Sequence, residues 1–131
     1  MALILVVEDN KINRELVSEV LGYEGHDVRE AADAEEALDL IHRSPPDLIL
    51  MDIALPGMDG LALTRQLKAA DNTRHIPVVA LTAFAMKGDK QKAIDAGCDG
   101  YLTKPINTRE LPGEVIRYLL NHGDAQRKEE S

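Results

Sequence analysis

The sequence predicts an α/β protein: a doubly wound, five-stranded parallel sheet with five helices covering its two faces. Five short β-like runs alternate along the chain with five segments in which apolar residues recur at helical spacing. Most of the runs are apolar throughout, which is typical of parallel strands buried on both faces. Because this alternation fits within 131 residues, about one domain, we expect a single layered domain with right-handed crossovers.

The first half of the chain contains three predicted strands and two predicted helices. Gly22 and Gly25 end the first helix, and Pro45-Pro46 prevents the second from continuing. In chain order we expect a strand over 3–7, a helix over 10–21, an edge strand over 27–31, a helix over 34–41 and a strand over 48–52.

The second half continues the alternation and ends in a polar segment. We expect a helix over 61–70, a strand over 77–82, a helix within 83–97, a short strand over 101–103 and a helix over 111–120. Charged residues crowd the apolar ones in 83–97, which indicates a largely exposed helix. From His122 onward there is no apolar periodicity, so we expect one domain over residues 1–121 and a flexible tail over 122–131.

Composition excludes several classes of protein. The net charge of −8 disfavours direct binding to nucleic acid or to an anionic membrane, because both would repel the chain. The one cysteine, Cys98, excludes an internal disulfide and fits a reducing cytoplasm. The opening apolar run is too short for a membrane span or a signal peptide. We therefore expect a cytoplasmic protein without membrane insertion, whose partners are cations or basic surfaces.

Four predicted strands deliver polar groups to one edge of the sheet. The groups are Glu8 and Asp9 from the first strand, Asp52 from the third, Thr82 from the fourth and Lys104 from the fifth. Ligands of open α/β sheets bind at this edge. Clustered carboxylates repel one another unless a cation joins them, and oxygen ligands suit Mg²⁺. The sequence therefore predicts a magnesium site.

The same groups suit phosphoryl transfer. A divalent cation would neutralise the approach of an anionic phosphoryl group to the Asp52 carboxylate, which then acts as the nucleophile and forms an acyl phosphate. Lys104 offers a mobile positive charge, and the Thr82 hydroxyl can donate to phosphoryl oxygens.

In these motifs the chain resembles the receiver domains of two-component response regulators over residues 3–121. The resemblance is strongest to stand-alone, single-domain members of the chemotaxis and cell-cycle types. Thr82 follows Asp52 by 30 residues, and Lys104 follows Tyr101 by three. The resemblance implies a flavodoxin-like receiver fold with strand order 2-1-3-4-5. The motifs that carry it are Glu8-Asp9, MDIALPGMDG around Asp52, ALTAFA around Thr82, and GYLTKPI with Tyr101 and Lys104-Pro105.

The resemblance also implies a role for each site residue. Asp52 would accept the phosphoryl group, while Mg²⁺, or Mn²⁺ in its place, would be held by Asp9, Asp52 and the backbone carbonyl of Ala54, with Glu8 acting through water. Thr82, the backbone amide of Ala83 and Lys104 would bind the phosphoryl group. Thr82 and Tyr101 would form a switch pair, and the Lys104-Pro105 peptide bond would be cis.

The partners implied by the resemblance are proteins. A histidine kinase or a histidine phosphotransfer protein would dock against Asn13 and Leu16 on the first helix. An output protein would bind the surface formed by the fourth helix, the fifth strand and the fifth helix. Because the sequence has little room for an output domain after the last predicted helix, we expect the response to act through that outside partner.

Other interpretations of the same residues remain open. Asp52 could simply end a strand, Tyr101 could serve packing alone, and Cys98 is interpreted as a small core residue. An aspartate-nucleophile phosphatase would need a second acid two residues after the nucleophile, where this chain has Ala54. A silent binding module would lack part of the acidic pocket, Thr82 or Lys104. Because Ala54 and Phe84 cannot hydrogen-bond an attacking water, we also hypothesise slow loss of phosphate.

Overall fold

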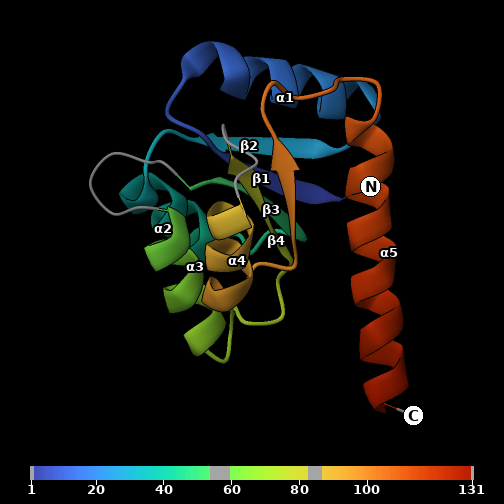
Figure 1. The fold of residues 1–131 in the computed structure, drawn as a ribbon. Helices are drawn as coiled ribbons and strands as arrows, with labels where there is room; N and C mark the ends of the chain where they lie inside the picture. Colours follow the sequence, from blue (N-terminus) through green and yellow to red (C-terminus); the bar gives the residue numbers. More distant parts are fainter. Residues whose placement is uncertain (1, 54–59, 83–86, 131) are drawn as a thin grey trace.

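Five parallel strands form one sheet in the order β2-β1-β3-β4-β5, as predicted (Figure 1). The structure is a computed structural model that describes residues 2–53, 60–82 and 87–130, with the backbone alone for 87–90 and 121–130. The strands are β1 Leu3–Val7, β2 Asp27–Ala31, β3 Leu48–Asp52, β4 Val78–Thr82 and β5 Gly100–Thr103. The helices are α1 Lys11–Tyr23, α2 Ala34–Arg43, α3 Gly60–Ala69, α4 Lys87–Ala96 and α5 Leu111–Glu130.

The central strands are apolar throughout because each contributes to two cores. Side chains alternate between the faces of a strand. In β1, Ile4 and Val6 therefore pack with Val17 and Leu21 of α1 and with the start of α5, on one face. Leu5 and Val7 pack on the other face with buried residues of α2 and α3. The sheet is covered on both sides, as the unbroken apolar runs predict (Figure 1).

Local capping determines where the first two helices begin. The Asn10 side chain accepts a hydrogen bond from the backbone N–H of Asn13, and that of Asp33 accepts one from Glu36. Side chains of this kind satisfy backbone donors that a helix leaves unpaired at its first turn. The Asn10 cap begins α1 at Lys11, so the turn that carries Glu8 and Asp9 lies directly between β1 and α1.

The last helix is longer than the sequence predicts. The backbone is helical through Glu130, whereas the apolar stripe predicts a helix only as far as residue 120. Residues 125–130 read AQRKEE, all good helix formers without proline, and helix propensity does not require the apolar periodicity on which the expectation rested. Flexibility of this segment stays a prediction.

No described helix combines the length and the apolar character that a membrane span requires. The sequence predicts a largely exposed fourth helix. Within the part of α4 whose side chains are described, Ala93 and Ala96 are buried whereas Ile94 is half exposed.

Candidate functional site

The polar groups predicted at the strand ends meet at the carboxyl edge of the sheet. Glu8 follows β1, Asp52 is the last residue of β3, Thr82 is the last of β4 and Lys104 follows β5. Beyond the ladder between β4 and β5, the backbone N–H of Lys104 donates to the carbonyl of Thr82 at 2.7 Å. This bond holds the start of the Lys104 loop against the end of the neighbouring strand.

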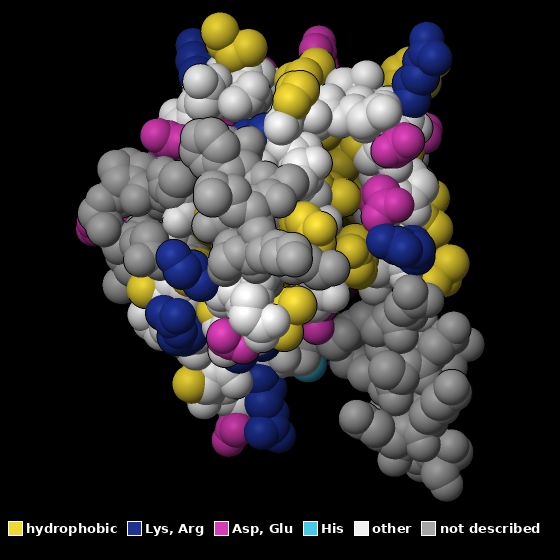
Figure 2. Space-filling model, in the orientation of Figure 1, with side chains coloured by type: hydrophobic (Ala, Val, Ile, Leu, Met, Phe, Trp, Pro, Cys, Tyr) yellow, Lys and Arg dark blue, Asp and Glu magenta, His cyan; other side chains and the backbone are white. Residues whose placement is uncertain are grey.

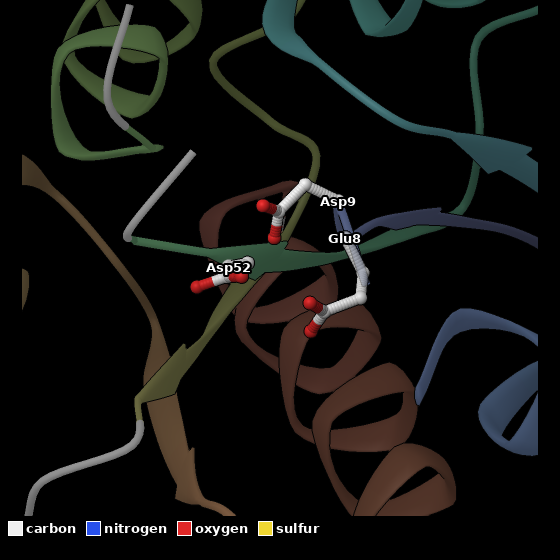
Figure 3. Close-up of side chains that lie close together, drawn as sticks. All are labelled: Glu8, Asp9 and Asp52. Carbon is white, nitrogen blue, oxygen red and sulfur yellow. The ribbon is translucent and has the colours of Figure 1, made fainter. Parts of the chain in front are cut away.

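Three carboxylates form the centre of this edge. One oxygen each of Glu8, Asp9 and Asp52 lies within 4.8 Å of the others, and Figure 3 shows the three side chains converging between β1 and β3. Glu8 and Asp52 are buried, with 1% and 3% of their surface exposed, whereas Asp9 is exposed. Hard oxygen donors at this spacing fit a divalent cation such as Mg²⁺, which retains several water ligands.

Lys104 lies between two of these acids. Its Nζ donates a hydrogen bond to Asp52 Oδ2 at 3.1 Å and lies 2.7 Å from Glu8 Oε2. The second contact is a short ion pair with a carboxylate that is almost completely buried. Burial opposes the charged form of Lys104, but the interactions with Glu8 and Asp52 outweigh it and raise the lysine pKa.

Both carboxylate oxygens of Glu8 have neighbours within the protein. Its Oε1 accepts a hydrogen bond from the backbone N–H of Asn10 at 3.1 Å, and its Oε2 faces Lys104. Burial raises the pKa of Glu8 and the charge of Asp52 adds to that effect, while Lys104 opposes it. The division of Glu8, Asp9 and Asp52 into direct and water-mediated ligands stays a prediction.

Two contacts at this site were not evident from the sequence. Arg14 of α1 donates to the backbone carbonyl of Glu8 at 2.9 Å and to Glu30 of β2 at 3.2 Å. At the other side, the start of α3 lies so close to the end of β3 that a side chain on Gly60 would overlap the carbonyl oxygen of Asp52. An arginine one turn into the helix and a glycine before an apolar stripe are the signals that could have indicated them.

The remaining predicted residues lie around this centre. Thr82 is buried, and Tyr101 is half-buried in β5. Asn13 and Leu16 line a cavity of about 350 Å³ together with Lys104, Pro105 and Ile106. The Lys104-Pro105 peptide bond is cis. Ala54, Ala83 and Phe84 lie outside the described residues.

Comparison with known proteins gives the family. The family model described as the response regulator receiver domain matches residues 4–116. The chain therefore belongs to the response regulator receiver domains, signalling modules of two-component systems. Members of this family bind Mg²⁺ at an acidic pocket and interact with histidine kinases or phosphotransfer proteins.

Particular relatives agree with this assignment. The polar-differentiation response regulator DivK of Brucella anthropi is 43% identical over 122 residues, which cover 93% of this chain and 97% of that protein. The receiver domain of NtrX from Brucella abortus has a similar structure, with a TM-score of 0.82 and 36% identity over 88% of this chain and 97% of that one. The chemotaxis protein CheY4 of Vibrio cholerae has a TM-score of 0.85 and 30% identity, covering 90% and 98%.

Proposed function

We propose that this protein is a single-domain response regulator whose Asp52 accepts a phosphoryl group from a phosphohistidine on a histidine kinase or phosphotransfer protein. The observation that carries the proposal is the convergence of Glu8, Asp9 and Asp52 within 4.8 Å, with Lys104 bound to Asp52. The extensive coverage of DivK supports the single-domain assignment.

The transfer itself is a substitution at phosphorus. An Asp52 carboxylate oxygen attacks the phosphorus, the bond from phosphorus to the imidazole nitrogen breaks, and an acyl phosphate forms on Asp52. The electron pair of the broken bond stays on the imidazole, which solvent protonates. Lys104 moves its hydrogen bond from the Asp52 carboxylate to a phosphoryl oxygen, where a charge-assisted bond is strong. Thr82 and the backbone amide of Ala83 donate to the other oxygens.

Asp9, Asp52 and the Ala54 carbonyl would hold the Mg²⁺ ion, or Mn²⁺, with Glu8 acting through water. The bound cation supplies charge neutralisation between the phosphoryl group and the carboxylates.

Phosphorylation would act as a switch through Thr82 and Tyr101. The hydroxyl of Thr82 moves toward the new phosphoryl group, and the Tyr101 ring turns inward behind it. Such a local charge change biases a two-state element and reshapes the surface around it. Tyr101 lies in β5, so the change would reach the surface formed by α4, β5 and α5.

That surface offers a place for an output protein. A cavity of about 710 Å³ lies there, and Figure 2 shows hydrophobic side chains gathered beside α5 on this face. The lining residues include Ile94, Tyr101, Leu102, Ile106, Glu110 and Tyr118. The phosphohistidine protein would dock elsewhere, on Asn13 and Leu16, which line a cavity with Lys104. Ile12, on the same helix, is 77% exposed.

Two variants of this function differ in what happens to the phosphate. A terminal switch keeps it, whereas a relay intermediate passes it to a second histidine. Ala54 and Phe84 follow Asp52 and Thr82 by two residues in the sequence, and neither side chain can hydrogen-bond an attacking water. We therefore expect slow hydrolysis of the acyl phosphate, which suits either role better than a fast signal. We also propose a cytoplasmic location, where two-component donors present their phosphohistidines.

Acetyl phosphate with Mg²⁺, followed by intact mass spectrometry, tests the proposal. We expect one phosphoryl adduct, its absence in Asp52→Asn, and an adduct lifetime far longer than seconds after the acetyl phosphate is removed. Turnover of phosphate esters without an adduct would instead indicate a phosphatase, and no adduct at all would indicate a silent binding module. Transfer of the phosphoryl group to an added phosphotransfer protein would favour the relay.

A further inference from the structure

We propose that Arg14 is a positioning residue for the acidic site: anchored by Glu30, it holds the turn that carries Asp9 where one divalent cation can join Asp9 to Asp52. This inference rests on the proposed function in one respect, namely that the site binds Mg²⁺.

The contacts of Arg14 place it on both sides of Asp9. Its guanidinium Nη1 donates to the carbonyl of Glu8 at 2.9 Å, and its backbone N–H donates to the carbonyl of Asn10 at 2.9 Å. One residue therefore binds the two carbonyls that flank Asp9 in the chain. The backbone bond is the first of α1 and would remain with another residue at position 14, so the guanidinium bond to the Glu8 carbonyl is the contribution of the arginine itself.

The guanidinium is itself fixed. Its Nε donates to Glu30 Oε1 at 3.2 Å, and 17% of the Arg14 side chain is exposed. Glu30 belongs to β2, which pairs with β1 in register up to Val7, and the next backbone N–H, that of Glu8, donates to the carbonyl of Ala31 at 3.0 Å. Arg14 thus ties the turn to β2, a strand of the sheet.

Such an anchor matters because the site is repulsive without a cation. Asp9 is exposed, so water would favour its movement away from the buried charges of Glu8 and Asp52. Each residue that becomes ordered on binding costs affinity. Holding the turn in advance leaves less of that cost for the moment when Mg²⁺ binds.

Charge alone predicts the opposite effect. A guanidinium close to the site repels a divalent cation, so removal of its charge would strengthen Mg²⁺ binding by electrostatics. Removal of a positioning residue would weaken it. Lysine keeps the charge but lacks the fixed fork that reaches Glu30 and the Glu8 carbonyl together. Weaker Mg²⁺ binding by Arg14→Gln would therefore indicate a positioning role, and tighter binding would indicate electrostatic repulsion alone. Weaker binding by Arg14→Lys, which keeps the charge, would also indicate positioning.

The test is Mg²⁺ titration of the full chain by calorimetry, with thermal unfolding in EDTA and in saturating Mg²⁺. We expect Arg14→Gln and Arg14→Lys each to weaken Mg²⁺ binding on the order of tenfold, as outer residues of metal sites do. The thermal shift caused by Mg²⁺ should shrink in both. Glu30→Gln should weaken binding in the same direction by a smaller factor.

Arg29 provides the matched control. It lies beside Glu30 on β2 and pairs with Asp27 on the surface, away from the acids. Arg29→Gln and Arg29→Lys should leave Mg²⁺ affinity within about twofold, because exposed ion pairs contribute little. A change equal to that of the Arg14 variants would overturn the positioning role.

Other results would also overturn it. One is that folded Arg14→Gln binds Mg²⁺ as tightly as the wild type or more tightly. Another is that Arg14→Lys keeps the wild-type affinity for Mg²⁺. A third is that the Arg14 variants lose the same amount of thermal stability in EDTA and in saturating Mg²⁺. If Arg14→Gln does not fold, Arg14→Lys and Glu30→Gln decide the question. A wild-type protein that binds Mg²⁺ but forms no adduct with acetyl phosphate would contradict the proposed function, while the Mg²⁺ affinities would still decide the role of Arg14.

Discussion

Asp52 is a buried carboxylate that faces two other acids and one lysine. Lys104 donates to it at 3.1 Å, and this single cation also lies 2.7 Å from Glu8. One ammonium group cannot neutralise three carboxylates. The metal-free site is therefore held at a cost in stability, and a group that lowers its negative charge should stabilise the fold.

We predict that Asp52→Asn raises the melting temperature in EDTA by about 3–5 °C, which corresponds to about 1 kcal/mol for a chain of this size. Asparagine removes the repulsion with Glu8 and Asp9 but keeps an oxygen that accepts from Lys104. Mg²⁺ should then stabilise the variant less than the wild type, because a ligand is lost. Differential scanning calorimetry with and without Mg²⁺ measures both effects.

Asp52→Ala is the control for that prediction. This substitution removes the repulsion and also the acceptor for Lys104. The melting temperature of Asp52→Ala in EDTA should therefore rise less than that of Asp52→Asn. No rise in either variant would contradict the interpretation of the acidic cluster as a repulsive site.

At the scale of elements, the site depends on how closely α3 approaches the end of β3. The first residue of α3 is Gly60, and a Cβ there would overlap the carbonyl oxygen of Asp52 and lie 2.8 Å from Ile53 Cα. The backbone N–H of Gly60 also donates to the carbonyl of Ile53 at 3.3 Å. Any side chain on Gly60 must push the helix away from the acidic site.

We expect Gly60→Ala to destabilise the protein by about 1–3 kcal/mol, as overpacking against backbone does, and to weaken Mg²⁺ binding. Urea unfolding and Mg²⁺ titration measure the two changes. Gly22→Ala is the matched control, because Gly22 lies inside α1 and a Cβ there meets nothing within 4 Å. That variant should gain about 0.5–1 kcal/mol and keep its Mg²⁺ affinity. Equal effects at the two positions would refute the steric argument.

A second close approach joins β5 to α5. A Cβ on Gly100 would overlap the ring and hydroxyl of Tyr118, which lines the same cavity as Tyr101. We predict that Gly100→Ala costs about 1 kcal/mol in the wild type, less than Gly60→Ala because the end of the Tyr118 side chain can move, and still less in a Tyr118→Ala background. A double-mutant cycle by urea unfolding measures this coupling. Additive effects would show that the ring is not what excludes a side chain from position 100.

The reactivity of Cys98, the one cysteine of the chain, reports on the unfolding of the whole molecule. Burial raises the pKa of Cys98, Asp99 adds to that effect, and Thr64 and Lys68 oppose it. Sγ lies 3.9 Å from the Thr64 hydroxyl, beside the core between α2, α3 and the sheet. Because the thiolate is the reactive form, less of the folded protein than of the unfolded chain is reactive near pH 8.

We therefore expect iodoacetamide to modify folded Cys98 about tenfold or more slowly than the urea-unfolded chain at pH 8. The folded rate should still rise with pH where the unfolded rate has reached its plateau, since the folded pKa is higher. Mg²⁺ should slow the reaction further if alkylation requires global opening. A folded rate equal to the unfolded rate would exclude a protected thiol.

Much of the fold follows from local patterns that the sequence carries by itself. The apolar runs of β1, β3 and β4 and the helical stripes depend on spacing within short windows, so strand number and layer order could be predicted. The end of the last helix was predicted too early because an apolar stripe was its only signal: residues 125–130 lack that stripe, yet they are good helix formers, and the backbone of α5 continues through them.

The sequence alone also determined which chemical groups reach the carboxyl edge, because parallel strands all end on one side and Glu8, Asp9, Asp52, Thr82 and Lys104 stand at those ends. Only the tertiary structure decided how the groups pair. Lys104 meets Asp52 across 52 residues of chain, Arg14 reaches back to the Glu8 carbonyl, and Gly60 admits α3 against β3. Such contacts depend on the direction of side chains from separately packed elements, which no local period encodes.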